Sequence, residues 1–515
     1  MLTKVWSVAS RGLEALEIEV EVNVAAKGFP GFQIVGLPTK AVEEAKERVR
    51  TALVNTGIAF PAKKIVVNLA PADIPKEGSA YDLAMAVGIL AAIGEIVLPA
   101  CAGRPEKKIY FYGEVGLDGR LRHTRGVFLL ASLAFEKGVK EIFVPKLSAN
   151  EASVVKGVKS FPVASLRQLI RHFQGEKKIR ALKNLDKNRL IEAAEVDFDF
   201  KEVVGQEQAK RALLIAAAGG HNVLMVGPPG SGKTMLARAL PGILPELLEA
   251  EALEVTKIYS VTGNIEPGGG LVRRRPFRSP HHTTSRMGLI GGGTKPMPGE
   301  ISLAHRGVLF LDEFAEYPRT TLEALRQPLE DGVVTVVRVA GAMKFPASFM
   351  LVAASNPCPC GWLNHPKKPC ICLPGQILNY QKRMSGPILD RIDIHINVPF
   401  VEVGKLRQDT PEVKEVHTSG VIRLQVVAAR KIQEIRLKND YIFTNGEMRN
   451  KQIKKYCRLS EDAERLLQTA ADKFQLSARS YFRVIKISRT IADLERAEGI
   501  EYNHVAEALQ YRVRS

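Results

Sequence analysis

One glycine-rich run has the residue types and the spacing that bind the phosphates of a nucleotide. Its members are Gly227, Pro228, Pro229, Gly230, Ser231, Gly232, Lys233 and Thr234, and it follows the apolar segment 222–226. The glycines let consecutive backbone N–H groups turn toward phosphate oxygens, the Lys233 ammonium can reach the β- and γ-phosphates, and the Thr234 hydroxyl can ligate Mg²⁺. The run therefore predicts a site for ATP and Mg²⁺.

A second acidic element farther along the chain strengthens this prediction. The apolar residues 308–311 have the pattern of a buried parallel strand and end in Asp312 and Glu313. We expect Asp312 to complete the Mg²⁺ shell and Glu313 to polarise the water that attacks the γ-phosphate. Together with Lys233, the two carboxylates indicate ATP hydrolysis.

Asn356 and Arg391 extend the predicted site. Asn356 follows the apolar run 349–354, which we expect to form a strand beside the strand of Asp312 and to bring the amide near the attacking water. Arg391 lies in the segment 386–393, where a guanidinium can be presented to a neighbouring molecule. The alternatives are a buried asparagine and an arginine held in an internal ion pair.

Four of the six cysteines fall in one proline-rich loop, as Cys358, Cys360, Cys370 and Cys372. Four thiolates can surround Zn²⁺ tetrahedrally, and such a site is structural because no coordination position stays open. His365 is an alternative ligand, and free thiols or redox-labile pairs are the alternative state. Cys101 and Cys457 stand alone and are expected in the core.

An insertion at 268–304 is rich in arginine and glycine. Its arginines Arg273, Arg274, Arg275 and Arg278 could contact DNA phosphates or stack on bases, and the alternative is a solvated surface loop. The chain as a whole has a net charge of +18, which points to a polyanionic partner such as single-stranded or branched DNA. The adjacent His281 and His282 make a weak metal pair, because neighbouring side chains rarely face one ion.

Length and composition predict a multidomain globular protein. The 515 residues exceed what one core accommodates, and 45% hydrophobic with 25% charged residues excludes extended disorder. The longest apolar run, 83–93, is about half the length that spans a bilayer, so we expect a buried helix there and no membrane association. With no export signal visible, we expect a cytoplasmic protein with reduced or metal-bound cysteines.

The chain divides by pattern into three parts. Residues 1–185 interleave strands and helices, with strands expected at 17–24, 33–35, 64–67, 108–112 and 141–144. Residues 186–400 carry the nucleotide motifs, and residues 401–515 have apolar positions at helical spacing. The expected fold class is therefore α/β with a C-terminal helical subdomain.

The order of these elements resembles that of the AAA+ ATPases with inserts in helix 2 and before the asparagine strand. Magnesium-chelatase ATPase subunits, MoxR proteins and minichromosome maintenance helicases share this order. The chain is more closely similar to the ComM/YifB family of magnesium-chelatase-like bacterial ATPases. The matching segments run over nearly the whole length: Gly36–Pro38, Val67–Ala72, Pro280–Thr283, Asn356–Gly361 and Leu389–Asp393.

The resemblance implies a role for each site residue. Lys233 and Thr234 would belong to Walker A, Asp312 and Glu313 to Walker B, and Asn356 would be sensor 1. It also implies that Arg391 is an arginine finger acting on a neighbouring subunit, that Arg479 is sensor 2 on a helical lid, and that the chain forms a closed hexameric ring. The family is linked with DNA branch migration in natural transformation.

Residues 1 to about 170 resemble the Lon protease domain, a ribosomal S5 domain 2-like fold, through Ile74–Gly78 and Gly113–Gly119. Lon-type proteolysis needs a serine nucleophile and a lysine base. Alignment of the Lon motif places Ala80 at the serine, with Ser79 one position early, and Phe128 at the lysine. We therefore expect a module without peptidase activity.

Three functions follow from these patterns. The leading hypothesis is an ATP-driven motor that moves branched or single-stranded DNA. The second is a chelatase- or MoxR-like ATPase that remodels a protein partner. The third, a Lon-like peptidase, lacks its catalytic pair in the alignment given above.

Overall fold

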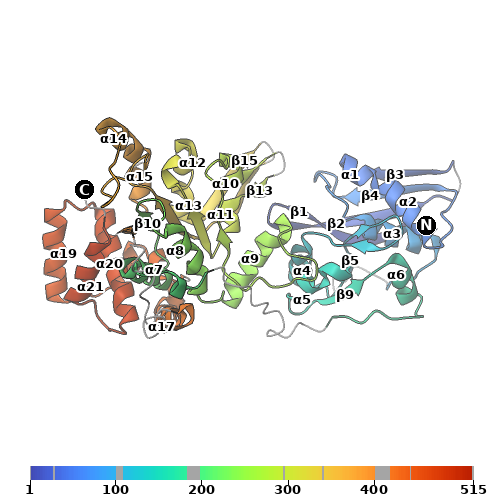
Figure 1. The fold of residues 1–515 in the computed structure, drawn as a ribbon. Helices are drawn as coiled ribbons and strands as arrows, with labels where there is room; N and C mark the ends of the chain where they lie inside the picture. Colours follow the sequence, from blue (N-terminus) through green and yellow to red (C-terminus); the bar gives the residue numbers. More distant parts are fainter. Residues whose placement is uncertain are drawn as a thin grey trace. The chain divides into compact units, whose positions relative to one another are not determined.

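We describe a computed structural model of the chain (Figure 1). The residues it describes are 2–26, 29–99, 108–182, 198–293, 296–338, 341–384, 386–400, 418–440 and 442–512. The predicted boundary at 185/186, the start of the third part at 401, and Cys101 lie outside them.

The chain forms two compact units, each of them discontinuous in sequence. Unit 1 comprises Met1–Glu192 with Leu248–Arg273, and unit 2 comprises Ala193–Leu247 with Arg274–Ser515. The segment Leu248–Arg273, which interrupts the sequence between the two nucleotide motifs, therefore groups with the N-terminal residues. The chain passes from one unit to the other three times.

Unit 1 is built on a seven-stranded mixed sheet in the order β3-β4-β2-β1-β5-β8-β9. Antiparallel pairing joins β1 to β2 and β2 to β4, and the remaining neighbours are parallel. Its elements are β1 (Leu2–Arg11), β2 (Glu14–Val24), β3 (Gly31–Val35), α1 (Lys40–Glu43), α2 (Ala45–Asn55), β4 (Lys64–Ala70), α3 (Asp82–Ile93), β5 (Ile109–Phe111), β6 (Glu114–Val115), β7 (Leu121–Arg122), α4 (Val127–Glu136), β8 (Glu141–Pro145), η2 (Lys146–Ser148), α5 (Ala149–Ser153), β9 (Lys159–Val163), α6 (Leu166–Phe173) and α9 (Glu249–Thr262).

One hydrophobic core of unit 1 forms between this sheet and α3, and a second forms between the sheet and helices α4 and α5. Strand β2 alternates buried and partly exposed residues, so one face of the sheet is apolar. Every residue of α3 from Asp82 to Ala92 is buried, as expected for the apolar run 83–93. Burial of each large aliphatic side chain contributes about 1.5–3 kcal/mol, which makes α3 the central helix of this unit.

Helix α9 is attached to α4 and α5 of unit 1 by polar contacts. The buried Glu151 carboxylate accepts hydrogen bonds from the Ser260 hydroxyl and from the Phe128 N–H. The Gly126 N–H donates to the Ser260 carbonyl at 3.1 Å, and the Asn150 amide donates to the Gly268 carbonyl at 2.7 Å. Because a buried carboxylate is costly without such donors, these bonds fix the segment firmly.

Unit 2 contains a five-stranded, all-parallel sheet in the order β11-β14-β17-β10-β18. Its elements are η3 (Phe200–Glu202), α7 (Glu207–Gly219), β10 (Val223–Val226), α8 (Lys233–Ala239), η4 (Leu240–Gly242), β11 (Phe277–Arg278), α10 (Arg286–Ile290), β12 (Gly291–Gly292), β13 (Met297–Pro298), α11 (Glu300–Leu303), β14 (Val308–Leu311), η5 (Phe314–Glu316), α12 (Arg319–Glu323), α13 (Arg326–Asp331), β15 (Val333–Arg338), β16 (Gly341–Pro346), β17 (Met350–Ser355), α14 (Pro374–Arg383), α15 (Gly386–Leu389), β18 (Ile394–Asn397), α17 (Ser419–Leu437), η7 (Lys438–Asp440), η8 (Asn445–Glu447), α18 (Asn450–Tyr456), α19 (Glu461–Lys473), α20 (Ala478–Leu494) and α21 (Tyr502–Gln510).

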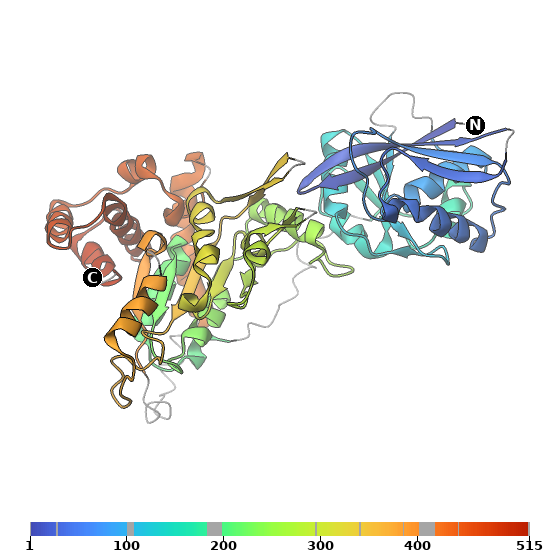
Figure 2. The ribbon, with the colours of Figure 1, turned by 90° about the horizontal axis from the view of Figure 1, so that it is seen from above.

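The apolar runs predicted as strands in unit 2 are strands. All residues of β14 and β17 are buried, as parallel strands covered on both faces require, and the two strands are neighbours. Strands β15 and β16 pair as an antiparallel hairpin, which Figure 2 shows as a two-stranded arm.

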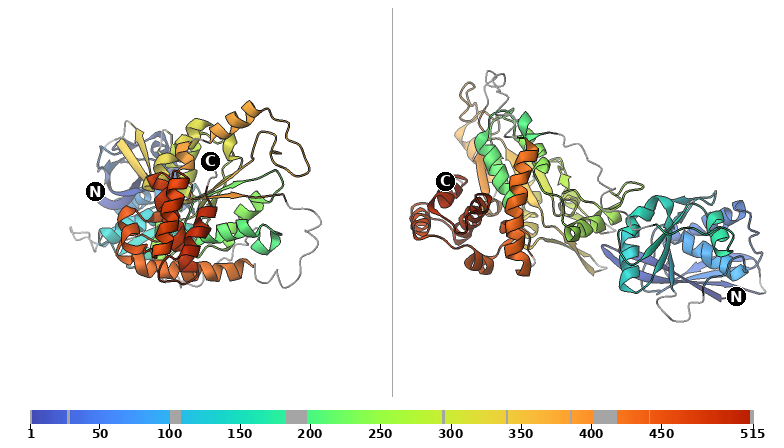
Figure 3. Two further views of the ribbon diagram at one scale, coloured as in Figure 1. Left: turned by 90° about the vertical axis from the view of Figure 1, so that its left-hand side faces the viewer. Right: turned by 90° about the horizontal axis from the view of Figure 1, so that it is seen from below.

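Helices α17 to α21 form the C-terminal part of unit 2. Serine hydroxyls cap α19 and α20, where Ser460 accepts from the Ala463 N–H and Ser477 from the Ser480 N–H. The long α17 lies beside α7 (Figure 3), and the Arg430 guanidinium donates to the Ala217 carbonyl at the end of α7. Within the described residues, no helix combines the length and the apolar character needed to cross a bilayer.

Candidate active site

The predicted nucleotide-binding residues meet at one edge of the sheet of unit 2. Strands β10, β14 and β17 are parallel neighbours, so their carboxyl ends lie side by side. The glycine-rich run follows β10, Asp312 follows β14, and Asn356 follows β17. In parallel α/β sheets this edge is where ligands bind.

Lys233 is the buried cation of this edge. Its ammonium donates to the Gly227 carbonyl at 2.7 Å and to the Pro228 carbonyl at 2.8 Å, and it lies 3.5 Å from the Asn356 amide oxygen. Burial lowers the pKa of Lys233 to about 8, although the Asp312 carboxylate opposes that change. A buried ammonium bonded mainly to neutral oxygens gains strongly from a bound phosphate.

Thr234 and Asp312 form a matched pair of oxygen ligands. The Thr234 hydroxyl donates to the Asp312 carboxylate at 2.8 Å. The other oxygen of Asp312 accepts the Glu313 N–H at 2.9 Å, while Glu313 itself has a left-handed backbone with φ of 51°. The Glu313 side chain is 55% exposed.

Close backbone approaches shape the phosphate loop. A side chain at Gly227 would collide with the Val398 carbonyl, and a Cβ at Gly361 would lie 2.6 Å from the Pro229 ring. Gly230 and Gly232 have positive φ angles of 76° and 91°, which favour glycine. These positions leave an anion cradle at the N-terminus of α8.

The sequence is similar along its whole length to bacterial proteins of one family. It is 43% identical over 512 residues to a protein of Haemophilus influenzae named competence protein ComM, with 99% of this chain and 97% of that protein covered. It is 40% identical to the Escherichia coli protein named YifB, with the same coverage of both chains. The chain belongs to the ComM/YifB family.

Family models place this ComM/YifB protein among the magnesium-chelatase-like AAA+ ATPases. The model of magnesium chelatase subunit ChlI matches residues 199–406, a second ChlI model matches 20–148, and a model of the ChlI C-terminal region matches 416–512. A magnesium-chelatase 38 kDa subunit of Rhodobacter capsulatus is 31% identical over 179 residues, which are 31% of this chain and 50% of that protein.

The family implies ATP and Mg²⁺, and the residues present fit both. Thr234 and Asp312 supply the oxygen ligands that Mg²⁺ prefers, and they are already in contact. Lys233 and the loop amides supply the phosphate cradle described above. The predicted Walker A and Walker B residues of this ComM/YifB protein are therefore assembled at one site.

Arg391 and Arg479 are brought together by a residue that the sequence analysis did not identify. Both guanidinium groups donate to the same oxygen of Glu330, at the end of α13. The Arg391 side chain is only 8% exposed and also donates to the Pro387 carbonyl, whereas that of Arg479 is 48% exposed. The hydrogen bond from Arg391 is the main cause that lowers the pKa of Glu330.

Replacing Glu330 by glutamine is expected to lower the free energy of unfolding by about 1–2 kcal/mol, because the buried Arg391 loses its counter-charge. The expected loss is smaller than for a fully buried ion pair, because the Glu330 side chain is 40% exposed. Urea unfolding of the full chain measures it. Glu323→Gln is the matched control, since its partner Arg319 is 73% exposed and should contribute less than about 0.5 kcal/mol. Equal effects of the two substitutions would contradict a structural role for Glu330.

Two further residues, to which the sequence analysis gave no role at the nucleotide site, lie there. The His282 ring lies 2.9 Å from the Glu313 carboxylate, edge-on to Tyr317. The Gln206 side chain, before α7, donates to the carbonyls of Ser231 and Pro399 and so joins the phosphate loop to the end of the sheet. In the sequence, His282 is one of two adjacent histidines and belongs to the family-matching segment Pro280–Thr283.

The arginines of the insertion have different surroundings. Arg275 donates to the carbonyls of Pro245 and Arg306, and Arg278 forms a bidentate pair with Glu300. Arg273 is partly buried, and Arg274 is exposed. Of the four predicted DNA contacts, Arg274 therefore presents the most accessible side chain.

In unit 1, the residues compared with the Lon motif have other partners. The Ser79 hydroxyl donates to Glu114, whose second oxygen lies 3.1 Å from the Arg122 guanidinium. Ala80 is buried, and Phe128 is a buried residue of α4. The partner of the Ser79 hydroxyl is therefore a carboxylate, and not the lysine of the Lon motif.

Proposed function

We propose that this ATPase is a ring-forming motor that moves single-stranded or branched DNA, as in branch migration during recombination or natural transformation. The observation that carries the proposal is the assembly of Lys233, Thr234, Asp312, Glu313 and Asn356 at one sheet edge. The net charge of +18 supports a polyanionic partner. A relative that covers the full chain is named a competence protein.

The chain's own residues would divide the work of hydrolysis. Mg²⁺ neutralises charge on the phosphates when it is bound, and Thr234 and Asp312 would hold it. Lys233 would bind the terminal phosphate, which satisfies its buried ammonium. The Glu313 carboxylate would accept a proton from the attacking water, and the Asn356 amide would help to orient that water.

The proposal includes a neighbouring copy of the chain. Arg391 would act as the finger that stabilises the transition state on the adjoining subunit, and Arg479 would act from the C-terminal helices, which we infer form a lid. Within one chain both arginines are held by Glu330, so each must leave this carboxylate to reach a phosphate. We propose that the ring is a closed hexamer. In such a ring the phosphates of bound ATP would compete with Glu330 for the two arginines.

We also propose the domain limits 1–185, 186–400 and 401–515, the first being a Lon-protease-like module without peptidase activity. We place the protein in the cytoplasm.

A protein partner is the alternative substrate, and one observation favours it. Arg275 and Arg278 form hydrogen bonds within the chain, so these two arginines of the insertion already have partners other than an external polyanion.

ATP turnover measured with and without DNA distinguishes the two substrates. With the full-length protein, a synthetic four-way junction and single-stranded DNA are expected to raise turnover several-fold. The DNA concentration for half-maximal stimulation should rise at least about tenfold between about 50 and about 200 mM salt, because phosphate contacts release counterions. Turnover that is indifferent to every DNA would reject the motor and favour the protein partner.

The matched variants Arg274→Gln and Arg465→Gln test where DNA binds. Both arginines are exposed, but Arg465 lies on α19 and pairs with Glu461. A phosphate contact by Arg274 predicts that its replacement lowers the salt slope by about one, while Arg465→Gln leaves the slope unchanged. Identical slopes in both variants would remove Arg274 from the DNA contacts.

A further inference from the structure

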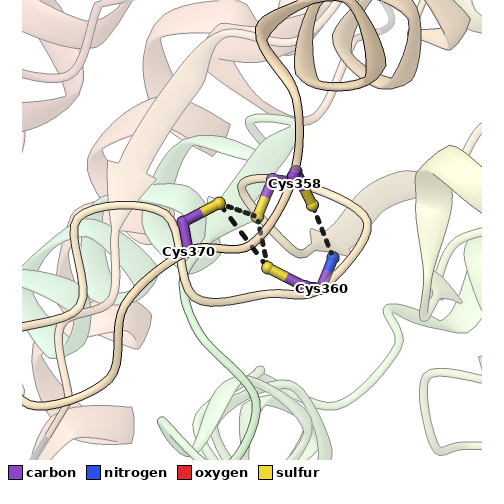
Figure 4. Close-up of side chains that lie close together, drawn as sticks. Cys358, Cys360 and Cys370 are labelled. Carbon is purple, nitrogen blue, oxygen red and sulfur yellow. Dashed lines mark hydrogen bonds between the residues drawn. The ribbon is translucent and has the colours of Figure 1, made fainter.

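The four clustered cysteines have the geometry of a four-thiolate metal site. They lie on the segment between β17 and α14, and all four Sγ atoms are within 4.8 Å of one another. The Sγ of Cys358 is 3.5 Å from that of Cys360 and 3.7 Å from that of Cys370, and the last two are 3.6 Å apart. Figure 4 shows these three side chains directed toward one another.

These separations match zinc coordination better than a disulfide. A tetrahedron with Zn–S bonds of about 2.3 Å has sulfur atoms about 3.8 Å apart. A disulfide would join two sulfurs at about 2.0 Å, whereas here three sulfurs are nearly equidistant. His365 is not in the cluster, because its Nδ1 accepts the N–H groups of Lys367 and Lys368.

Ring contacts of Trp362 with His365 and Lys368 hold the middle of the loop, whereas its C-terminal end buries little apolar surface. Ile371 and Leu373 are 82% and 67% exposed, so the apolar side chains at its C-terminal end do not form a core. Cys358, in contrast, is fully buried. A bound metal would add to the order of a segment that buries so little apolar surface.

The same loop contacts the ATP site directly. Cys358 is separated from Asn356 only by Pro357, and Asn356 faces Lys233. Gly361, next to Cys360, packs so closely on Pro229 of the phosphate loop that a Cβ at this position would lie 2.6 Å from the proline ring. Displacement of the thiols would therefore move both Asn356 and the phosphate loop.

We propose that Cys358, Cys360, Cys370 and Cys372 bind one structural Zn²⁺, and that this ion positions Asn356 and Pro229 for ATP hydrolysis. The positioning step rests on the ATPase function proposed above, whereas the metal site does not. With four protein ligands, the ion has no open position and takes no part in the chemistry. The cysteines are positioning residues.

Metal content is the first test. Elemental analysis of the full-length protein should find about one zinc per chain, and Co²⁺ in its place should give the thiolate-to-cobalt absorption of a tetrahedral site. Cys358→Ala and Cys370→Ala should lose the metal. Cys457→Ala is the matched control, because Cys457 is also a buried cysteine of unit 2 but lies outside the cluster, and it should keep the metal. Absence of zinc and cobalt binding in the unmodified chain would overturn the site.

Removal and return of the metal test the positioning step without relying on a variant that folds poorly. Stripping zinc with a chelator should lower kcat at least about tenfold with a smaller change in KM, since a group acting in the transition state is misplaced, and added Zn²⁺ should restore it. Binding of a fluorescent ATP analogue, followed in parallel, reports on the phosphate loop. If metal-free and metal-loaded protein bind and hydrolyse nucleotide alike, the positioning role is wrong. If the loaded protein binds zinc and the analogue but never hydrolyses ATP, the ATPase proposal fails while the zinc site stands.

Discussion

Replacing Glu313 by glutamine is expected to lower the rate of ATP hydrolysis about 100-fold or more while ATP binding is retained. The substitution removes the carboxylate that we propose accepts a proton from water, and a general base of this kind contributes about 10²–10⁴-fold. A 100-fold loss corresponds to about 2.7 kcal/mol in the activation free energy. Thr234 and Asp312, which we propose hold Mg²⁺, are not changed by the substitution, so the nucleotide should keep its binding site.

Steady-state turnover and the affinity for a fluorescent ATP analogue together test this result. Glu316→Gln is the matched control, because Glu316 lies three residues away on η5 and pairs with Arg383 on the surface. Its turnover should stay within about twofold of the unmodified protein, as is usual for an exposed ion pair. Turnover of Glu313→Gln at the level of this control would mean that another group activates the water.

The contact between His282 and Glu313 bears on how the Glu313→Gln result is interpreted. The histidine ring is within hydrogen-bond distance of the Glu313 carboxylate, so the carboxylate is already engaged before a water binds. Glutamine can still accept a hydrogen bond from this ring, and the Pro280–Thr283 segment should therefore keep its place. Loss of hydrolysis then reports on the charge at Glu313 and not on a displaced loop.

The elements that carry the ATP site could be predicted because short stretches of sequence determine them. Strands β14 and β17 are buried on both faces, so their sequences are continuous apolar runs that end where a polar residue begins. The glycines of the phosphate loop are required by backbone angles and close contacts at single positions. The sequence therefore locates Lys233, Asp312 and Asn356 without any knowledge of long-range packing.

The contacts of Glu330 and His282 could not be predicted, because each joins residues that are distant in the chain. Glu330 meets Arg391 and Arg479, which are 61 and 149 residues away. Neither partner has a local signal that selects this carboxylate among many. The grouping of α9 with unit 1 could not be predicted for the same reason, because the contact of Ser260 with Glu151 joins residues 109 positions apart.

The second large effect is expected for Arg391→Ala, which should abolish ATP hydrolysis in the assembled protein. An arginine finger contributes about 10³–10⁵-fold to hydrolysis, because its charge meets the negative charge that develops on the transferred phosphoryl group. Mixing this variant with a Lys233→Ala chain should restore part of the activity. At some interfaces of the mixed ring, the Lys233→Ala chain would supply Arg391 to the ATP site of an Arg391→Ala chain, whose Lys233 is intact.

A double variant, Lys233→Ala with Arg391→Ala, is the control for the mixing experiment, since it forms the same interfaces but has no finger to supply. Mixtures of Arg391→Ala with this double variant should stay inactive. Activity in both mixtures, or in neither, would show that Arg391 does not act on a neighbouring subunit.

The ion pair with Glu330 separates this catalytic effect from a loss of stability. Arg391 is buried against Glu330, so Arg391→Ala also removes a structural contact and leaves the carboxylate with Arg479 alone. Glu330→Gln breaks the same pair but leaves the finger in place. If Arg391 acts in trans, Glu330→Gln should lose stability and keep hydrolysis, whereas Arg391→Ala should lose hydrolysis and recover it by mixing. Loss of hydrolysis to the same extent in both variants would instead make the Arg391–Glu330 pair a purely structural feature of unit 2.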